Sequence, residues 1–253
     1  MPVLTLADGH GLAYAVTGPE GAPWLVLGNS LMTTQAIWAE QVAAFSDRFR
    51  VLTWDQRGHG ASALPAGPLD MATLAADLVA LCEALDVTGA TYVGLSMGVP
   101  TGLTALPALV GRVSQLVLVD GLAASSGAAF WDERIGFARA NGMAALAAQT
   151  AARWLPSAVA KRPELEAMIA SVPLEGFAAC AHALRGYDAR AAFEDFAGPV
   201  LLIAGEADAR IVPGMQALAS SRPGTRLALV PGAGHLPCFE APERFNALLA
   251  ETL

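Results

Sequence analysis

The chain has 253 residues, 54% of them hydrophobic, which is enough for one large core and argues against a disordered chain. Its formal net charge is −8, and Lys and Arg form no cluster. A nucleic acid or an anionic membrane surface is therefore disfavoured as a partner. The first residues, MPVLTLADGHG, lack the basic and apolar regions of a signal peptide, and no later apolar stretch reaches transmembrane length, so we expect a cytoplasmic protein.

The cysteines favour neither a disulfide framework nor a zinc site. There are three of them, Cys82, Cys180 and Cys238, which is an odd number without the spacing of metal ligands. We expect them to be small buried residues.

In chain order, short apolar runs alternate with helical patterns, which is typical of helices packed around a mostly parallel sheet. LAYAVTG alternates like an early antiparallel strand. Six later runs are continuous enough to be buried on both faces: WLVLGNS, RVLTWD, ATYVGLS, QLVLVDG, PVLLIAGEAD and RLALVPGAGH. Helical patterns lie near residues 34–47, 71–86, 97–110, 213–220 and 240–252. The sequence thus predicts one α/β domain.

The alternation breaks between about residues 125 and 195. This stretch is rich in Ala and predicts several helices with no clear strand. We interpret it as a helical lid inserted into a core formed by residues 1–124 and 196–253. The alternative is a set of helices that serve only packing.

Gly94-Leu95-Ser96-Met97-Gly98 fits the pattern G-x-S-x-G, in which a strand turns sharply into a helix and exposes a serine hydroxyl. The glycines allow the strand and the helix to approach closely. The apolar run before Ser96 and the helical pattern after it supply the context that the motif requires, and Pro100 fits the first helical turn. We therefore predict that Ser96 is a catalytic nucleophile.

A serine nucleophile needs a base to remove its proton and an acid to orient that base, and on this architecture the three follow in the order serine, acid, histidine. Of the four histidines, His10 lies in an early turn, His59 precedes the serine and His182 falls in the inserted helices. His235 follows the last apolar run, so we predict it as the base. His59 we interpret as a residue that stabilises its loop.

Asp208, the last residue of PVLLIAGEAD and on the loop that leaves this strand, is the predicted acid. Glu206 comes too early on the same loop and is expected to face solvent or a neighbouring amide. Asp120, at the end of QLVLVD, remains a second candidate. For the oxyanion that forms during acyl transfer, the predicted donors are the backbone amides of Met97, next to the nucleophile, and Leu31, in the loop after WLVLGNS.

Several stretches carry a resemblance to a known family: LVLGNSLMTTQAIWAEQVAAF, FRVLTWDQRGHGAS, GLSMG, WDERIGFARANGMAALA with the later RWL, FAACAHALRGYDAR and GAGHLPCFEAPERF. Over nearly its full length the chain resembles the α/β-hydrolase superfamily. The NSL stretch, W-x-x-R-I and R-x-x-G-M resemble its 3-oxoadipate enol-lactonase branch. The resemblance implies an α/β-hydrolase fold, a mostly parallel central sheet flanked by helices with a helical lid.

The resemblance to the enol-lactonases also implies an activity. It is the opening of a five-membered enol-lactone that bears a carboxylate, giving a 3-oxo diacid in the catabolism of aromatic compounds, with no metal or organic cofactor. Trp131, Arg134 and Trp154 are then the implied substrate-binding residues, since a guanidinium suits a carboxylate. The alternative is a packed aromatic and an arginine in a surface ion pair.

Two positions depart from that branch. Val99 and Met32 stand where a glycine is usual, so their bulk leaves a changed pocket and a changed substrate open. A general carboxylesterase or another lactonase is the alternative small-molecule hydrolase. A non-catalytic sensor that binds a ligand is a further hypothesis, disfavoured because the predicted serine, histidine and aspartate are all present. Whether the chain forms a homo-oligomer also stays open.

Overall fold

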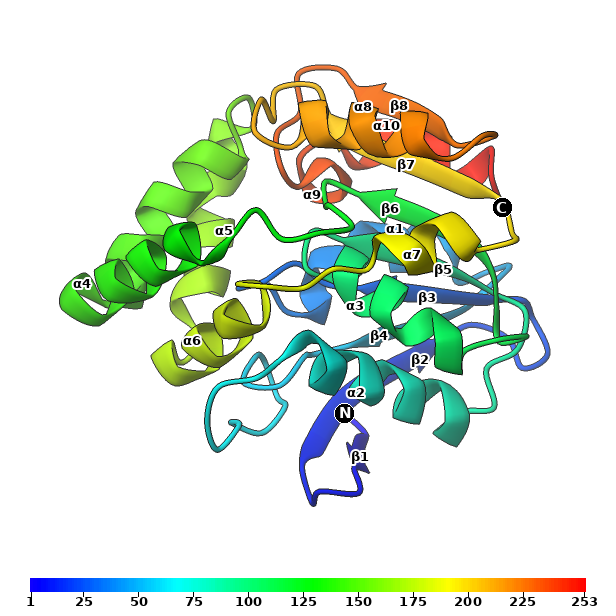
Figure 1. Ribbon diagram of the computed structural model, residues 1–253, viewed down its shortest axis with the longest axis horizontal. Helices are drawn as coiled ribbons and strands as arrows, with labels where there is room; N and C mark the ends of the chain where they lie inside the picture. Colours follow the sequence, from blue (N-terminus) through cyan, green and yellow to red (C-terminus); the bar gives the residue numbers. More distant parts are fainter.

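The computed structural model describes residues 1–253, and an eight-stranded sheet forms its centre (Figure 1). The strands are β1 (Val3–Thr5), β2 (Gly11–Thr17), β3 (Trp24–Gly28), β4 (Arg50–Trp54), β5 (Ala90–Leu95), β6 (Val113–Val119), β7 (Val200–Gly205) and β8 (Arg226–Val230). Their order is β1-β2-β4-β3-β5-β6-β7-β8. β2 runs antiparallel to both β1 and β4, and all other neighbours are parallel. The predicted α/β class is confirmed, and the short β1 is the one strand that the sequence pattern did not predict.

The two faces of the sheet are covered by different helices. The helical segments are η1 (Gln35–Trp38), α1 (Ala39–Phe45), α2 (Met71–Ala84), α3 (Gly98–Ala105), η2 (Leu106–Ala108), α4 (Ala128–Trp154), η3 (Val159–Lys161), α5 (Arg162–Ala170), α6 (Leu174–Ala183), α7 (Arg190–Asp195), α8 (Val212–Ser221), α9 (Pro237–Glu240) and α10 (Pro242–Ala250). Buried side chains of α3, α7, α8 and most of α2 belong to one core cluster, and those of α1 and α10 belong to the other, together with Met71 and Leu74 from the start of α2. The sheet is thus the middle layer of three (Figure 1).

Alternate residues of the central strands explain why their sequences are continuously apolar. On β3, Leu25 and Leu27 join one core cluster, while Val26 between them joins the other. Because successive side chains of a strand point to opposite faces, a sheet covered on both sides needs apolar residues at every position.

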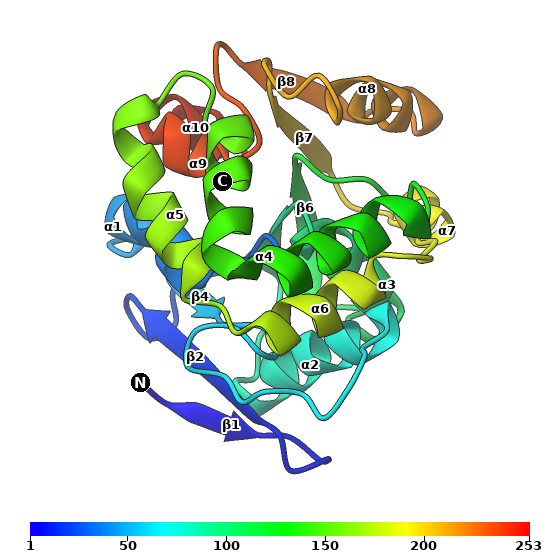
Figure 2. The same cartoon turned by 90° about the vertical axis from the view of Figure 1, so that its left-hand side faces the viewer.

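The stretch between β6 and β7 carries the inserted helices α4, α5 and α6, which stand at one end of the sheet, on the left in Figure 1, and face the viewer in Figure 2. α4 packs against both α5 and α6. It is interrupted at Gly142, whose φ of 83° lies in the left-handed region that glycine adopts without strain. The predicted absence of strands here holds apart from one isolated bridge between Ala124 and Asp188. That these helices act as a lid remains a proposal.

Two further sequence expectations concern burial and membranes. All three cysteines are buried and unpaired, as expected. None of the helices combines the length and the apolar character that a membrane-spanning helix needs.

Candidate active site

Ser96 sits at the turn from β5 into α3, and its φ of 52° is in the left-handed region, which is strained for a residue with a side chain. The flanking glycines are required by close approach. A Cβ on Gly94 would lie 2.6 Å from the carbonyl oxygen of Gly98, and one on Gly98 would lie 2.6 Å from that of Gly28. The sharp turn predicted by the G-x-S-x-G pattern is therefore present, and it places Ser96 at the carboxyl end of the sheet.

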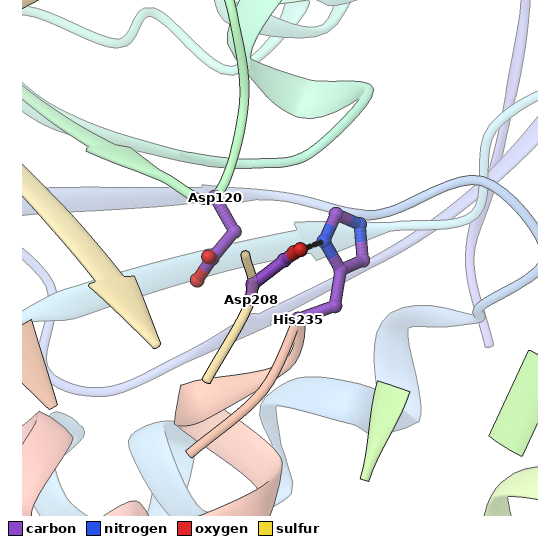
Figure 3. A group of neighbouring side chains, drawn as sticks. All are labelled: Asp120, Asp208 and His235. Atoms are coloured by element: carbon purple, nitrogen blue, oxygen red, sulfur yellow. Dashed lines mark hydrogen bonds and ion pairs between the residues drawn. The ribbon is translucent and has the colours of Figure 1, made fainter. Parts of the chain in front are cut away.

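Three side chains from the ends of three strands meet in a hydrogen-bonded chain. Ser96 follows β5, Asp208 follows β7 and His235 follows β8. The Nε2 of His235 is 2.9 Å from the Oγ of Ser96, and its Nδ1 is 2.6 Å from Oδ2 of Asp208 (the latter pair in Figure 3). When Nδ1–H donates to Asp208, the lone pair of Nε2 is free to accept the serine proton. The arrangement can therefore generate a serine nucleophile.

The electrostatics of Asp208 suit an orienting carboxylate. Its partial burial acts to raise its pKa, but the hydrogen bond and charge of His235 and the backbone amides of Arg210 and Ile211 outweigh burial. The pKa of Asp208 is consequently lowered below its ordinary value. The side chain is ionised at neutral pH and holds the Nδ1 proton of His235 in place.

Asp120, the second candidate acid, lies beside this pair but is bonded elsewhere (Figure 3). It is fully buried, and both of its carboxyl oxygens lie 3.1 Å from the amide nitrogen of Gly205. Burial first, and the charge of Asp208 second, raise the pKa of Asp120 well above its ordinary value. Ligand atoms of Asp120, Asp208 and His235 lie within 4.8 Å of one another, a spacing that suits a metal ion. Asp208 and His235 already bond to each other, however, so the geometry favours an acid–base pair with Asp208 as the acid.

Glu206 takes no part in this cluster. Its Oε2 accepts a hydrogen bond of 3.2 Å from the amide of Gly232, and the residue is exposed. Both outcomes agree with the expectation that it faces solvent or a neighbouring amide.

The two predicted oxyanion donors, Leu31 and Met97, both line the cavity above Ser96. Neither backbone amide donates to an acceptor within the protein. Met97 directly precedes α3, where amides lack partners within the helix and the helix dipole favours negative charge. Two amides without an acceptor at this place are available to a ligand oxygen.

His59 fixes the loop that carries Leu31. The ring is fully buried, its Nε2 accepts a 3.0 Å hydrogen bond from the amide of Met32, and its Nδ1 lies 3.0 Å from the carbonyl oxygen of Arg57. The proton must be on Nδ1, because Nε2 accepts. Met32 itself has a φ of 65°, so the histidine holds a strained residue in place. This agrees with the interpretation of His59 as a loop-stabilising residue.

His59 should make the fold sensitive to mild acid. Burial lowers its pKa from 6.5 to about 4. Between those two values the unfolded chain binds a proton that the folded chain does not, so the free energy of unfolding falls as the pH is lowered, by about 3 kcal/mol in all. Urea unfolding of the wild type and of His59→Gln at pH 7, 6, 5 and 4 measures this. The variant should lack that part of the pH dependence; an unchanged slope would contradict the assignment.

The cavity above Ser96 has a volume of about 240 Å³ and reaches from the triad side chains to the inserted helices. Trp131, Arg134 and Trp154 all line it. The ring of Trp154 lies 4.8 Å from the ring of His235, centroid to centroid, and its carbonyl oxygen accepts the amide of His235 at 3.0 Å. Trp154 thus supports the imidazole directly.

Arg134 is buried, and no carboxylate pairs with it. Its Nη2 donates a hydrogen bond of 2.6 Å to Oγ1 of Thr150, while its buried Nε–H has no acceptor within the protein. The alternative of a surface ion pair is therefore wrong for Arg134. A largely buried guanidinium that lines a cavity and is paired with no carboxylate is suited to a negatively charged ligand group.

The cavity is also lined by Phe130, Arg153 and Arg210, which were not predicted from the sequence as site residues. The only sequence signal was their nearness to predicted site residues, since Phe130 precedes Trp131 and Arg210 lies two residues after Asp208. The two residues that depart from the enol-lactonase pattern, Met32 and Val99, lie in different surroundings. Met32 lines the cavity, whereas Val99 does not and instead packs in the core beside Gly121.

Comparison with known proteins places these features in a family. Residues 10–248 match the alpha/beta hydrolase family. The chain is 34% identical to 3-oxoadipate enol-lactonase 2 of Acinetobacter baylyi, over 95% of this chain and 92% of that protein. It resembles the crystal structure of the enol-lactonase from Burkholderia xenovorans with 30% identity and a TM-score of 0.90, covering 99% and 98% of the two chains. The malate-bound thermophilic esterase of Thermogutta terrifontis is similar at 27% identity with a TM-score of 0.89, covering 100% and 98%.

Proposed function

The chain belongs to the alpha/beta hydrolase family, and from that premise we propose that it opens an enol-lactone that carries a carboxylate. The similarity to enol-lactonases already indicates a hydrolase that acts on ester bonds. The finer proposal is the conversion of 3-oxoadipate enol-lactone to 3-oxoadipate in the catabolism of aromatic compounds. One observation carries it: the Ser96–His235–Asp208 chain opens into a cavity that also holds the unpaired, buried Arg134.

In the first half of the proposed reaction, the Oγ of Ser96 attacks the lactone carbonyl carbon, and its proton passes to Nε2 of His235. Asp208 stabilises the imidazolium that forms. The negative oxygen of the tetrahedral intermediate accepts hydrogen bonds from the amides of Leu31 and Met97, which have no acceptor within the protein. Collapse breaks the bond between the carbonyl carbon and the ring oxygen, and His235 returns the proton to that oxygen.

In the second half, the acyl group remains on Ser96 and the leaving enol is part of the same molecule. A water molecule gives its proton to His235 and attacks the acyl carbon. The ester bond to Ser96 then breaks, the serine recovers its proton, and a carboxylate is released. The enol tautomerises to the ketone, which gives a 3-oxo dicarboxylate. No group outside this chain, the substrate and water is required by these steps.

The substrate carboxylate is assigned to Arg134. Arg134 lines the cavity and no carboxylate of the protein neutralises it, and a charge-assisted hydrogen bond to a carboxylate is among the stronger polar contacts. Trp131, which lines the same cavity and stacks edge-on against Phe130 at 5.0 Å, and Trp154 supply apolar walls for the ring.

The test compares freshly generated 3-oxoadipate enol-lactone with 4-nitrophenyl acetate, a neutral ester. Wild-type protein should prefer the lactone in kcat/KM. In Arg134→Gln the ratio of the two kcat/KM values should fall by about 10- to 100-fold, as expected for the loss of a charge-assisted hydrogen bond. Arg139→Gln, an exposed arginine of α4 outside the cavity, is the matched control and should keep the ratio. Turnover of the neutral ester alone would contradict the lactonase proposal.

A carboxylesterase is the second candidate, and Met32 is the observation that favours it. Its buried side chain occupies part of the cavity wall at a position where the enol-lactonase pattern has glycine. The added bulk changes the shape of the space beside Ser96. If the neutral ester is preferred, the same nucleophile serves an esterase and Met32 is the residue to exchange.

A further inference from the structure

Three arginines surround one aromatic ring in the wall of the cavity. The guanidinium carbons of Arg134, Arg153 and Arg210 lie 5.6, 5.8 and 4.3 Å from the centroid of the Phe130 ring. All four residues line the cavity above Ser96. We call Arg153 and Arg210 the rim arginines, because both are exposed while Arg134 is buried deeper.

The rim arginines have no protein partner. The side chains of Arg153 and Arg210 form neither an ion pair nor a hydrogen bond to another residue. Elsewhere six arginines are paired with carboxylates: Arg48, Arg57, Arg112, Arg185, Arg190 and Arg226. In a chain with a net charge of −8, acidic residues are plentiful, yet none forms an ion pair with the rim arginines. The nearby charge of Asp208 acts on Arg153, but that carboxylate is bonded to His235.

Holding three positive groups around one ring is electrostatically unfavourable. Burial, followed by the charges of Arg153 and Arg210, lowers the pKa of Arg134 to about 10. Burial and then Arg210 also lower the pKa of Arg153. Among the carboxylates of the cavity, Asp208 is bonded to His235, and burial favours the neutral form of Asp120. A single ligand carboxylate at Arg134 would offset only part of this positive charge.

We propose that Arg153 and Arg210 form a second anion-binding subsite at the rim of the cavity, so that the site binds dicarboxylates with one carboxylate at Arg134 and the other at the rim arginines. The placement of the first carboxylate rests on the proposed function. The second follows from the unpaired guanidinium groups, which match carboxylates in geometry. For a lactonase that forms a dicarboxylate, the product can leave Ser96 and bind again with its second carboxylate at the rim. It then competes with the substrate, and a following reaction must consume it.

The experiment measures inhibition of 4-nitrophenyl acetate hydrolysis by adipate and by hexanoate, which have the same number of carbons but two carboxylates and one. In the wild type, adipate should inhibit about 10-fold more strongly, the effect of one additional charge-assisted contact. This preference should weaken as salt is raised, because the rim is exposed. The assay uses a neutral ester, so it reports on the subsite even if the enol-lactone is not the substrate.

Arg153→Gln and Arg210→Gln should each reduce the ratio of hexanoate to adipate inhibition constants, and the double variant should bring it close to one. Arg153→Lys keeps the charge without the planar fork and should retain part of the preference. Arg139→Gln, outside the cavity, is the control that should keep the wild-type ratio. Equal inhibition by both acids in the wild type, or an unchanged ratio in the double variant, would overturn the proposal.

Discussion

Ser96→Ala is expected to reduce kcat for every ester or lactone substrate by roughly 10⁶-fold, the loss seen when the nucleophile of a serine hydrolase is removed. The physical reason is that His235 then has no hydroxyl to deprotonate, and the covalent route through an acyl-enzyme disappears. The amides of Leu31 and Met97 still stabilise negative charge, so a trace of hydrolysis by water should remain. Single-turnover kinetics with 4-nitrophenyl acetate measures both the rate and the missing burst of nitrophenol.

The same variant also separates catalysis from folding. Alanine at position 96 keeps a side chain at the strained φ of 52°, so the backbone strain and the Tm should stay close to those of the wild type. Adipate should still raise the Tm of the variant, because the arginines are untouched. Turnover retained in folded Ser96→Ala would exclude Ser96 as the nucleophile.

The sequence predicted the core of this site because the site is built from strand ends. Parallel strands that are buried on both faces produce continuous apolar runs, and the residue after each run is fixed at one edge of the sheet. Ser96 directly follows β5, and Asp208 lies three residues beyond the end of β7. His235 lies five residues beyond β8, an edge strand of which only Val230 is buried, so the prediction that this run is buried on both faces was wrong. That His235 lies within hydrogen-bond distance of Asp208 (2.6 Å) and of Ser96 (2.9 Å) could therefore be predicted from the order of the strands.

The rim arginines could not be predicted in this way. Arg153 and Phe130 lie at opposite ends of α4, 23 residues apart in the sequence, and they meet only because the helix is interrupted at Gly142. An unbroken α4 would keep its two ends far apart, since each residue adds 1.5 Å along the axis. Periodicity within a helix carries no information about such a reversal. The contact between Arg153 and Phe130 thus depends on the interruption of α4 at Gly142, which the Ala-rich sequence pattern does not indicate.

Asp208→Asn is expected to reduce kcat by about 10⁴-fold, as for the equivalent exchange in other serine triads. An asparagine can place its amide nitrogen against Nδ1 of His235, and the ring proton then moves to Nε2. Nε2 would donate to the Oγ of Ser96 instead of accepting its proton, so the serine is no longer activated. The ionised form of Asp208 is favoured over a wide pH range because its pKa is lowered, and the wild-type rate should not depend on it near neutral pH.

Asp120→Asn is the matched control, since it makes the same exchange on the neighbouring carboxyl. Asp120 bonds to the amide of Gly205 and not to the imidazole, and its raised pKa favours the neutral form. An amide in place of a neutral carboxyl should therefore cost less than 10-fold in kcat. The reverse order, with Asp120→Asn the more damaging exchange, would transfer the orienting role to the end of β6. Two carboxylates close to one histidine would repel each other, and burial reduces this repulsion because it raises the pKa of Asp120 while the bond to His235 lowers that of Asp208.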